Sequence, residues 1–335
     1  MLNYTIRRLA IAVPTLLIIA LAIFLLLELA PGDPMANVPL TVPPEVKEKM
    51  REALGLGQPG YIRFGKWILQ FLWVEPLHWI DTWAGTAFAE GQQRIISWQT
   101  RSPVMDIVAQ RIPQTLWVVG LAYVVGVLIA LPIGIYSAYR QYSVFDQAGT
   151  FISMVGYSVP PFFSGVLVIV IFSVKLGWFP SIYDTTLVVN DWASFKVQLK
   201  QMVMPVMVLA LQTTAQISRF MRASMLDNLN QDYVRTARAK GLGENTVVLT
   251  HVLRNSMIPV VTVIALGVPG IFGGAIITEQ VFKVNGIGQL LITAIQANDL
   301  PMVQTLTFIF AVLIVVFNLI ADILYGILDP RIRYD

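Results

Sequence analysis

The sequence contains no cysteine and unusually little charge. The absence of cysteine among its 335 residues excludes disulfides and thiolate metal sites. Only 13% of the residues are charged, against roughly a quarter in soluble globular chains. At the same time 56% of the residues are hydrophobic and the mean hydropathy is +0.67. This composition argues against an ordinary soluble domain and predicts an integral membrane protein.

The motifs of phosphate-binding and hydrolytic enzymes are also absent. No G-x-x-x-x-G-K-[ST] loop occurs, and the nearest glycine pairs, 241/243 and 286/288, lack the lysine. The two histidines, His78 and His251, are expected on opposite sides of the membrane, and neither H-E-x-x-H nor a serine elbow is present. We therefore expect no catalytic residue, no metal site and no cofactor on this chain. Any ATP and magnesium would be bound by a separate ATPase.

The net charge is positive, which in a soluble protein could indicate binding to nucleic acid. The formal charge is +3 and the pI is about 9.1. In a membrane protein an excess of lysine and arginine follows from the positive-inside rule. We therefore expect a lipid bilayer, and no nucleic acid, as the surroundings of this chain.

Six apolar stretches predict an all-α protein with six membrane-spanning helices. A span needs about 20 mostly apolar residues, and backbone groups in lipid must be hydrogen-bonded internally, so each stretch should be helical. The fourth is the weakest because Gln212, Thr213, Thr214 and Gln216 interrupt it. The predicted spans are residues 9–27, 115–139, 147–174, 201–218, 255–278 and 300–321.

The first stretch shares a basic start, Arg7 and Arg8, with signal peptides. Its apolar core exceeds the usual length of about 7–15 residues and no small-residue cleavage site ends it, which favours a retained helix. Lysine and arginine are more frequent in the connections on the N-terminal side of the membrane. Both termini are therefore expected in the cytoplasm.

A long segment, residues 31–112, separates the first two spans and is expected outside the cell. Pro43 and Pro44 open a short amphipathic helix over residues 45–55, which Gly55 should close. We divide the chain into residues 1–112, the first span with the external region, and 113–335, a five-helix core. The external region is rich in tryptophan, which suits either the membrane interface or a small packed domain: Trp67, Trp73, Trp79, Trp83 and Trp98.

The connection between the fourth and fifth spans, about residues 219–256, is longer and more basic than an ordinary helix–helix connection. Gly241 and Gly243 mark a break between two helix-forming segments. The pattern predicts a helix, a glycine break, a short helix and then the next span. Such a hairpin would project rigidly on the cytoplasmic face. The alternative is a solvated basic loop, since the positive-inside rule alone accounts for its charge.

Ionisable residues are few at the predicted membrane helices. Those present lie near predicted helix ends, where pairing at the interface suffices: Glu28, Lys175, Arg219, Glu279 and Asp322. The lack of a charge near the middle of the membrane argues against a proton- or sodium-driven carrier. The best candidates for lining a solute pathway are Gln212, Thr213, Thr214 and Gln216, although polar packing between helices explains them equally well.

The segment after the fourth span resembles the EAA loop of ABC importer permeases, in the form found in the dipeptide, oligopeptide and nickel permease family. The match covers residues 233–242, Tyr-Val-Arg-Thr-Ala-Arg-Ala-Lys-Gly-Leu, and residues 253–259, Leu-Arg-Asn-Ser-Met-Ile-Pro. Each further fragment is weak alone, but all follow in order along nearly the whole chain. They are Ala-Pro-Gly-Asp-Pro at 30–34, Arg-Glu-Ala-Leu-Gly-Leu-Gly-Gln-Pro at 51–59, Arg-Ile-Pro-Gln-Thr at 111–115, Ser-Val-Pro-Pro-Phe at 158–162, Leu-Gly-Trp-Phe-Pro at 176–180, Thr-Glu-Gln-Val-Phe at 278–282, Leu-Pro-Met-Val-Gln at 300–304 and Leu-Asp-Pro-Arg-Ile-Arg at 328–333.

The resemblance implies a permease of the bacterial inner membrane whose loop docks into a groove of a cytoplasmic ATPase. It also implies a second homologous permease, two ATPase subunits and an external substrate-binding protein. The docking contact would combine apolar Leu242, Val247 and Val248 with a basic rim. The residues so assigned to coupling are Tyr233, Arg235, Thr236, Ala237, Ala239, Lys240, Gly241, Leu242, Val247 and Arg254.

The sequence departs from the family pattern in three places. Arg235-Thr236-Ala237 replaces Glu-Ala-Ala, Asn285-Gly286 replaces Pro-Gly, and residues 243–246 are less basic than in relatives. The substrate stays open among peptides, nickel chelates, opines, glutathione and sugar derivatives. A self-sufficient carrier or channel is the alternative function, but it would favour an intramembrane charge or an internal repeat, and the sequence has neither.

Overall fold

The computed structural model describes residues 2–29, 43–53, 57–273 and 275–328. This part of the chain is helical, and its only β pairing is an isolated bridge between Ile96 and Pro103. The chain separates into two compact units. One holds the described residues of 1–9, 113–289 and 314–335, and the other holds those of 10–112 and 290–313.

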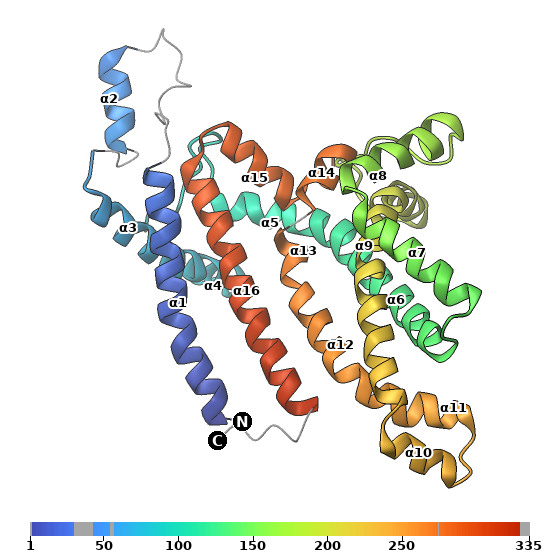
Figure 1. Cartoon of the computed structure of the whole chain (residues 1–335). Coiled ribbons are helices and arrows are strands. Elements are labelled where there is room, and N and C mark those ends of the chain that lie inside the picture. Colours follow the sequence, from blue (N-terminus) through green and yellow to red (C-terminus); the bar gives the residue numbers. More distant parts are fainter. Residues whose placement is uncertain (1, 30–42, 54–56, 274, 329–335) are drawn as a thin grey trace. The chain divides into compact units, whose positions relative to one another are not determined.

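The larger unit is built around two helices that pack along each other, α6 (Leu121–Tyr139) and α9 (Trp192–Leu229) (Figure 1). Glycines of α6 allow this close approach. A Cβ on Gly126 would lie 2.6 Å from Thr213 Cβ, and one on Gly134 would lie 2.6 Å from Met221 Cβ. The other elements of this unit are α7 (Val144–Ser158), α8 (Pro161–Val168), η3 (Ile169–Lys175), α10 (Asp232–Ala239), α11 (Glu244–Thr246), η4 (Val247–Val252), α12 (Leu253–Gly267), α13 (Pro269–Gly273) and α14 (Ile276–Phe282).

The smaller unit carries the segment predicted to lie outside the membrane. Its elements include α2 (Pro44–Ala53), α3 (Gly60–Leu69), η1 (Gln70–Val74) and α4 (Glu75–Ala84). The amphipathic helix predicted over 45–55 is therefore present as α2, while its predicted end at Gly55 lies outside the described residues. Helices shared by the two units are α1 (Leu2–Glu28), α5 with η2 (Val104–Thr115, Leu116–Gly120), α15 (Ile287–Gln296) and α16 (Leu300–Leu328).

The tryptophans of this region divide into buried and exposed side chains. Trp67 is buried in an aromatic cluster, with its ring 5.2 Å from that of Phe308. Trp73, Trp79 and Trp83 are exposed, and their place at a membrane interface stays a prediction. The region is thus a packed unit with an aromatic outer face.

The membrane spans differ from the prediction in number and shape. Within the described residues, four helices are long and apolar enough to cross a membrane: Ile6–Glu28, Val104–Tyr139, Glu244–Ile271 and Leu300–Ile323. A bent pair would add a fifth. The predicted fourth span lies in α9, which has the length but is not among the apolar spans because polar residues dilute it. The all-α membrane architecture is confirmed, and the count of six stays a prediction.

The predicted third span, 147–174, is not one straight helix. The helices Val144–Ser158 and Pro161–Lys175 meet at an angle of 104°. Pro160 and Pro161 cause the break, because proline supplies no N–H donor and forces the preceding residue out of the helical region. The periodicity of apolar residues cannot reveal such a bend.

The predicted fifth span, 255–278, is displaced. The helix begins at Glu244, inside the predicted connection, and α12 ends at Gly267. Pro269 then opens α13, and Thr278 lies in the separate helix α14. The predicted connection is also shorter at its other end, because residues 219–229 continue α9.

Candidate coupling hairpin

The predicted hairpin is present between α9 and α12. Helix α10 is followed by a turn at residues 240–243, and a second helix runs from Glu244 into α12 (Figure 1). Gly241 makes the turn with a φ of +77°, a conformation that costs a residue with a Cβ about 1 kcal/mol or more. Its N–H donates to Arg238 O at 2.9 Å, which closes the end of α10.

An apolar core holds the hairpin together. Val234 of α10 is fully buried, as are Val247 and Val252 of the second helix. These side chains belong to one cluster with Met221 and Met225 of α9. The hairpin is therefore continuous with the packed core of the larger unit, and the alternative of a solvated loop is wrong.

A charged bridge adds to this packing. The Arg238 guanidinium donates to both carboxylate oxygens of Glu244, at 3.1 and 2.6 Å, across the turn. The pair is about 40% exposed, so its net contribution is at most about 1 kcal/mol. The fork geometry nevertheless fixes the direction of the second helix relative to α10.

The outer surface of the hairpin displays most of the residues assigned to coupling. Tyr233 is 37% exposed and its hydroxyl donates to Asn228 Oδ1 at 2.8 Å. Leu242 is 40% exposed at the tip, next to the turn. The other exposed members are Arg235, Thr236, Ala239, Lys240, Gly241 and Arg254. This surface combines one apolar side chain with three cations.

Three assignments need correction. Ala237, Val247 and Val248 are 5%, 0% and 5% exposed within the chain itself. They have no free surface for a partner, because they form the internal core of the hairpin. Val247 and Val248 lie on the face of the second helix that packs against α10. An apolar helical face that packs inward has the same sequence pattern as one that faces a partner, so the sequence could not distinguish the two.

The base of the hairpin is joined by hydrogen bonds that the sequence did not single out. Ser224 Oγ of α9 donates to Ser256 O of α12 at 2.8 Å, and the single proton of Ser256 Oγ is shared between Val252 O of its own helix, at 2.9 Å, and Ser224 O, at 3.2 Å. Both side chains are buried. The two helices that carry the hairpin are therefore tied to each other directly beneath it.

A buried ion pair fixes the same stretch of α9 to α7. Arg222 Nε and Nη2 donate to the two oxygens of Asp146 at 2.7 and 2.8 Å, and Asp146 is 3% exposed. In the sequence Arg222 is one of several basic residues that follow the fourth predicted span. The signal that could have found the pair is Asp146 itself, an acid at the start of an apolar stretch.

The candidate pathway residues do not share one face of α9. Thr214 Oγ1 donates to Gly126 O at 3.1 Å, and Thr213 lies against the same glycine. These two threonines contact α6, as polar packing between helices predicts. Gln216 is exposed, and Gln212, Thr213 and Thr214 are half-buried, so the role of all four in a pathway stays a prediction.

The ionisable residues near helix ends fall into two kinds. Glu28 pairs with Arg63, and Asp322 lies 3.3 Å from Arg8, as pairing at an interface predicts. Glu279 is different: it is completely buried, and no cation of the described residues pairs with it. The expectation of interface pairing was wrong for Glu279, because α14 folds back into the unit instead of meeting water.

Comparison with known proteins is consistent with this architecture. The family model for binding-protein-dependent transport system inner membrane components matches residues 130–334, and the model for the N-terminal part of the same components matches residues 1–119. The chain is 37% identical to the oligopeptide transport system permease protein AppB of Bacillus subtilis (strain 168), over 100% of both chains. It is 36% identical to a putative peptide transport system permease of Brucella abortus (strain 2308), over 98% of both, and 37% identical to the glutathione transport system permease GsiC of Escherichia coli (strain K12), over 100% of both. The chain therefore belongs to the family of binding-protein-dependent transport system inner membrane components, as a permease of the peptide-import type of ABC transporter.

Proposed function

We propose that the exposed surface of the α10–α11 hairpin is the contact through which a cytoplasmic ATPase drives this permease. The observation that carries the proposal is the continuity of the hairpin core with α9, in which Val234 and Val247 pack in the same cluster as Met221 and Met225. A rigid element of this kind passes a push at its tip to the spanning helices, whereas a flexible loop would absorb it.

The proposed assembly contains this chain, a second homologous permease, two ATPase subunits and an external substrate-binding protein. ATP and Mg²⁺ would be bound by the ATPases, since this sequence has no phosphate loop. The hairpin and both termini would face the cytoplasm of a bacterial cell, in agreement with the excess of lysine and arginine on that side.

The proposed cargo is a peptide or a related small solute. The support is that relatives of full length are named oligopeptide and glutathione permeases. Among the described residues no cluster of His, Cys, Asp or Glu could hold a metal ion. We therefore assign most of the selectivity to the binding protein.

A surface substitution tests the coupling contact. Leu242→Asp places a charge on the tip of the hairpin without changing its core. The variant should therefore insert into the membrane and keep the melting temperature of the original protein, but it should lose its ATPase during purification in mild detergent. Val188→Asp is the matched control, because Val188 is 73% exposed in the connection before α9. Retention of the ATPase and of ATP-driven uptake by Leu242→Asp would refute the contact.

The turn glycine gives a second test. Gly241→Ala introduces a Cβ at a φ of +77°, whereas Gly243→Ala introduces one at a φ of −61°, and neither Cβ meets another atom within 4 Å. Only the first change strains the hairpin. Uptake should therefore fall in Gly241→Ala and stay unchanged in Gly243→Ala. Equal uptake by both would show that the geometry of the turn is not required.

A further inference from the structure

A long helix of the smaller unit carries large apolar side chains on its exposed side. The elements α3, η1 and α4 follow one another without a break from Gly60 to Ala84 (Figure 1). In the second half of this helix, five exposed side chains fall within about 120° of its circumference, at about 100° per residue. We call this surface the outer face, and its residues are Leu72, Trp73, Trp79, Ile80 and Trp83.

The ionisable side chains of the same stretch lie on the opposite side of the helix. Residues 69–84 contain Glu75, His78 and Asp81, and at the same angular step none of them falls on the outer face. Glu75 is 2% exposed. Asp81 accepts hydrogen bonds from the segment of residues 86–89. A helix that faces water carries its charges outside and its apolar side chains inside, so the arrangement here is the reverse.

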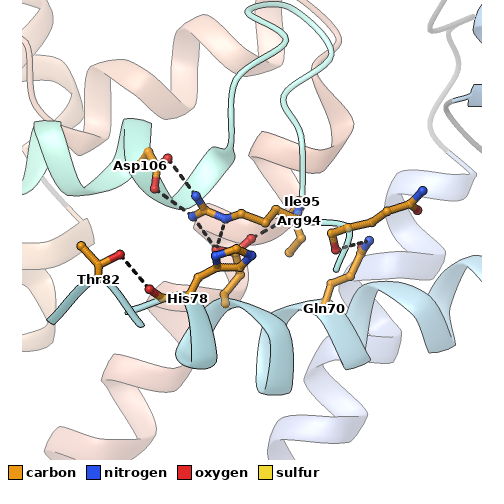
Figure 2. A network of polar contacts seen from close by, with 8 residues as sticks. Gln70, His78, Thr82, Arg94, Ile95 and Asp106 are labelled. Carbon is orange, nitrogen blue, oxygen red and sulfur yellow. Dashed lines mark hydrogen bonds and ion pairs between the residues drawn. The ribbon is translucent and has the colours of Figure 1, made fainter. Parts of the chain in front are cut away.

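A polar network within the unit holds these inward charges. Arg94 Nη2 donates to Glu75 Oε2 at 2.7 Å and to Asp106 Oδ1 at 2.8 Å. The backbone N–H of Ile95 donates to the other oxygen of Glu75 at 3.1 Å. Figure 2 shows His78 pointing from the helix toward Arg94. Ionisable side chains of membrane proteins face the protein interior and pair with one another in this way, which leaves the lipid-facing side without charge.

Ring contacts within the smaller unit place this helix beside two membrane spans. Phe64 of α3 lies against Phe24 of α1, with ring centroids 5.4 Å apart, and Phe71 of η1 lies against Phe308 of α16, with ring centroids 4.9 Å apart. The span in α16 begins at Leu300, and eight residues at about 1.5 Å each put Phe308 about 12 Å inside that end. The helix therefore passes the spans at the depth of lipid and not above the membrane surface.

We propose that the outer face is inserted into the lipid leaflet at the Leu300 end of α16. Its partner is the hydrocarbon and glycerol region of the bilayer. Tryptophan suits this boundary because its indole is apolar with a single N–H, and an amphipathic helix in a leaflet buries its apolar face about 5–10 Å deep. The helix is not among those apolar enough to cross the membrane. It anchors the smaller unit in one leaflet, in addition to the spans in α1 and α16.

The absence of cysteine allows a direct test, because one introduced cysteine can carry a nitroxide spin label. Leu72→Cys and Ile80→Cys place the label on the outer face. Ile18→Cys, at a side chain 68% exposed on a span, gives the reference for lipid. Glu90→Cys, at an exposed carboxylate beyond α4, gives the reference for water. The full-length chain is purified with any subunits that stay bound and is reconstituted in vesicles of palmitoyl-oleoyl phosphatidylcholine.

Electron paramagnetic resonance measures how well oxygen and a polar nickel chelate reach each label. At residues 72 and 80 we expect an oxygen-to-nickel ratio at least about tenfold above that at residue 90, because hydrocarbon excludes the polar chelate. A ratio equal to that at residue 90 would place the outer face in water and overturn the proposal. Labels that neither reagent reaches would show that a protein subunit covers the face, which would overturn it as well.

A charge on the outer face gives a second, independent measurement. Ile80→Asp places a carboxylate in lipid and should lower the melting temperature of the protein in the same vesicles. Val188→Asp, at a side chain 73% exposed in the connection before α9, is the control and should leave the melting temperature unchanged. If the outer face were in water, Ile80→Asp would be as neutral as the control. Equal melting temperatures of the two variants would therefore overturn the proposal.

Discussion

Thr115 and Glu279 meet in the interior of the larger unit, where Thr115 Oγ1 donates to Glu279 Oε1 at 3.3 Å. Both side chains are completely buried. The other carboxylate oxygen accepts from the backbone N–H of Gln289 at 2.8 Å, and Thr115 Oγ1 accepts from Ile287 N at 2.8 Å. The pair thus ties the helix that contains Thr115 to α14 and to the start of α15.

The pH dependence of stability should report on Glu279. Burial raises the pKa of the Glu279 carboxyl above the ordinary value of a glutamate, although the hydrogen bonds from Gln289, Thr115 and Gly288 oppose part of this rise. A raised pKa in the folded state favours folding at low pH, and this stabilisation is lost as pH rises through that pKa. The melting temperature should therefore fall with increasing pH above about 4.5 more steeply than in Glu279→Gln.

Comparison of these two proteins isolates Glu279, since all other titrating groups are common to both. Thermal unfolding in detergent between pH 4 and pH 8 measures it. Parallel curves would mean that the carboxyl does not titrate in this range. A steeper fall in Glu279→Gln would contradict the stated direction of the pKa shift.

Gly286 is the position where this network tolerates no side chain. A Cβ there would lie 2.3 Å from Glu279 Oε1 and 2.6 Å from Thr115 Oγ1. Gly286→Ala should therefore displace one of these side chains and destabilise the protein by about 2–4 kcal/mol, the usual cost of breaking a buried polar network. Gly65→Ala, whose Cβ meets nothing within 4 Å in the helix α3, should be neutral or slightly stabilising. Equal melting temperatures for both variants would contradict this.

The sequence predicted features that depend on neighbouring residues, such as turns. It did not predict features that depend on contacts between segments far apart in the chain. Gly241 indicates a turn by residue type alone, and the structure has a turn there after α10. The separate short helix predicted after it is instead the start of a continuous helix that runs from Glu244 to Gly267. Glu279 was expected at an interface because its neighbours in sequence end an apolar stretch. Its burial depends on Thr115 and Gln289, which only the folded chain brings near it. For the same reason the ends of helices were less well predicted than their presence.

In the candidate site, too, some residues could be predicted from the sequence and others could not. Exposed Arg235, Lys240 and Leu242 could be named from the motif, since a surface needs no partner within the chain. The burial of Val247 and the hydrogen bonding between Ser224 and Ser256 could not be predicted from the motif, because both depend on which helical face packs inward.

The Asp146–Arg222 pair should respond asymmetrically to mutation. Arg222→Met leaves the carboxylate of Asp146 buried without its cation, which costs about 3–5 kcal/mol. The double variant Asp146→Leu with Arg222→Met removes both charges and should recover much of the lost stability. Thermal unfolding of the two variants in detergent checks the order. A double variant less stable than Arg222→Met would show that the carboxylate has a stabilising role of its own.

The serine tie beneath the hairpin should matter more for coupling than for folding. Ser224→Ala with Ser256→Ala removes the hydrogen bond from Ser224 Oγ to Ser256 O and the proton that Ser256 Oγ shares between Val252 O and Ser224 O. Each bond ends on a backbone carbonyl of a helix, so no buried donor is left unmet. The loss of stability should be about 1 kcal/mol per bond. In reconstituted complexes, ATPase association should persist while uptake per ATP hydrolysed falls, because the hairpin can then move without carrying both helices. Ser153→Ala is the control, since Ser153 contacts Ser218 and joins α9 to α7 instead. Unchanged uptake per ATP in the double variant, or an equal decrease in Ser153→Ala, would show that motion does not pass through the tie between Ser224 and Ser256.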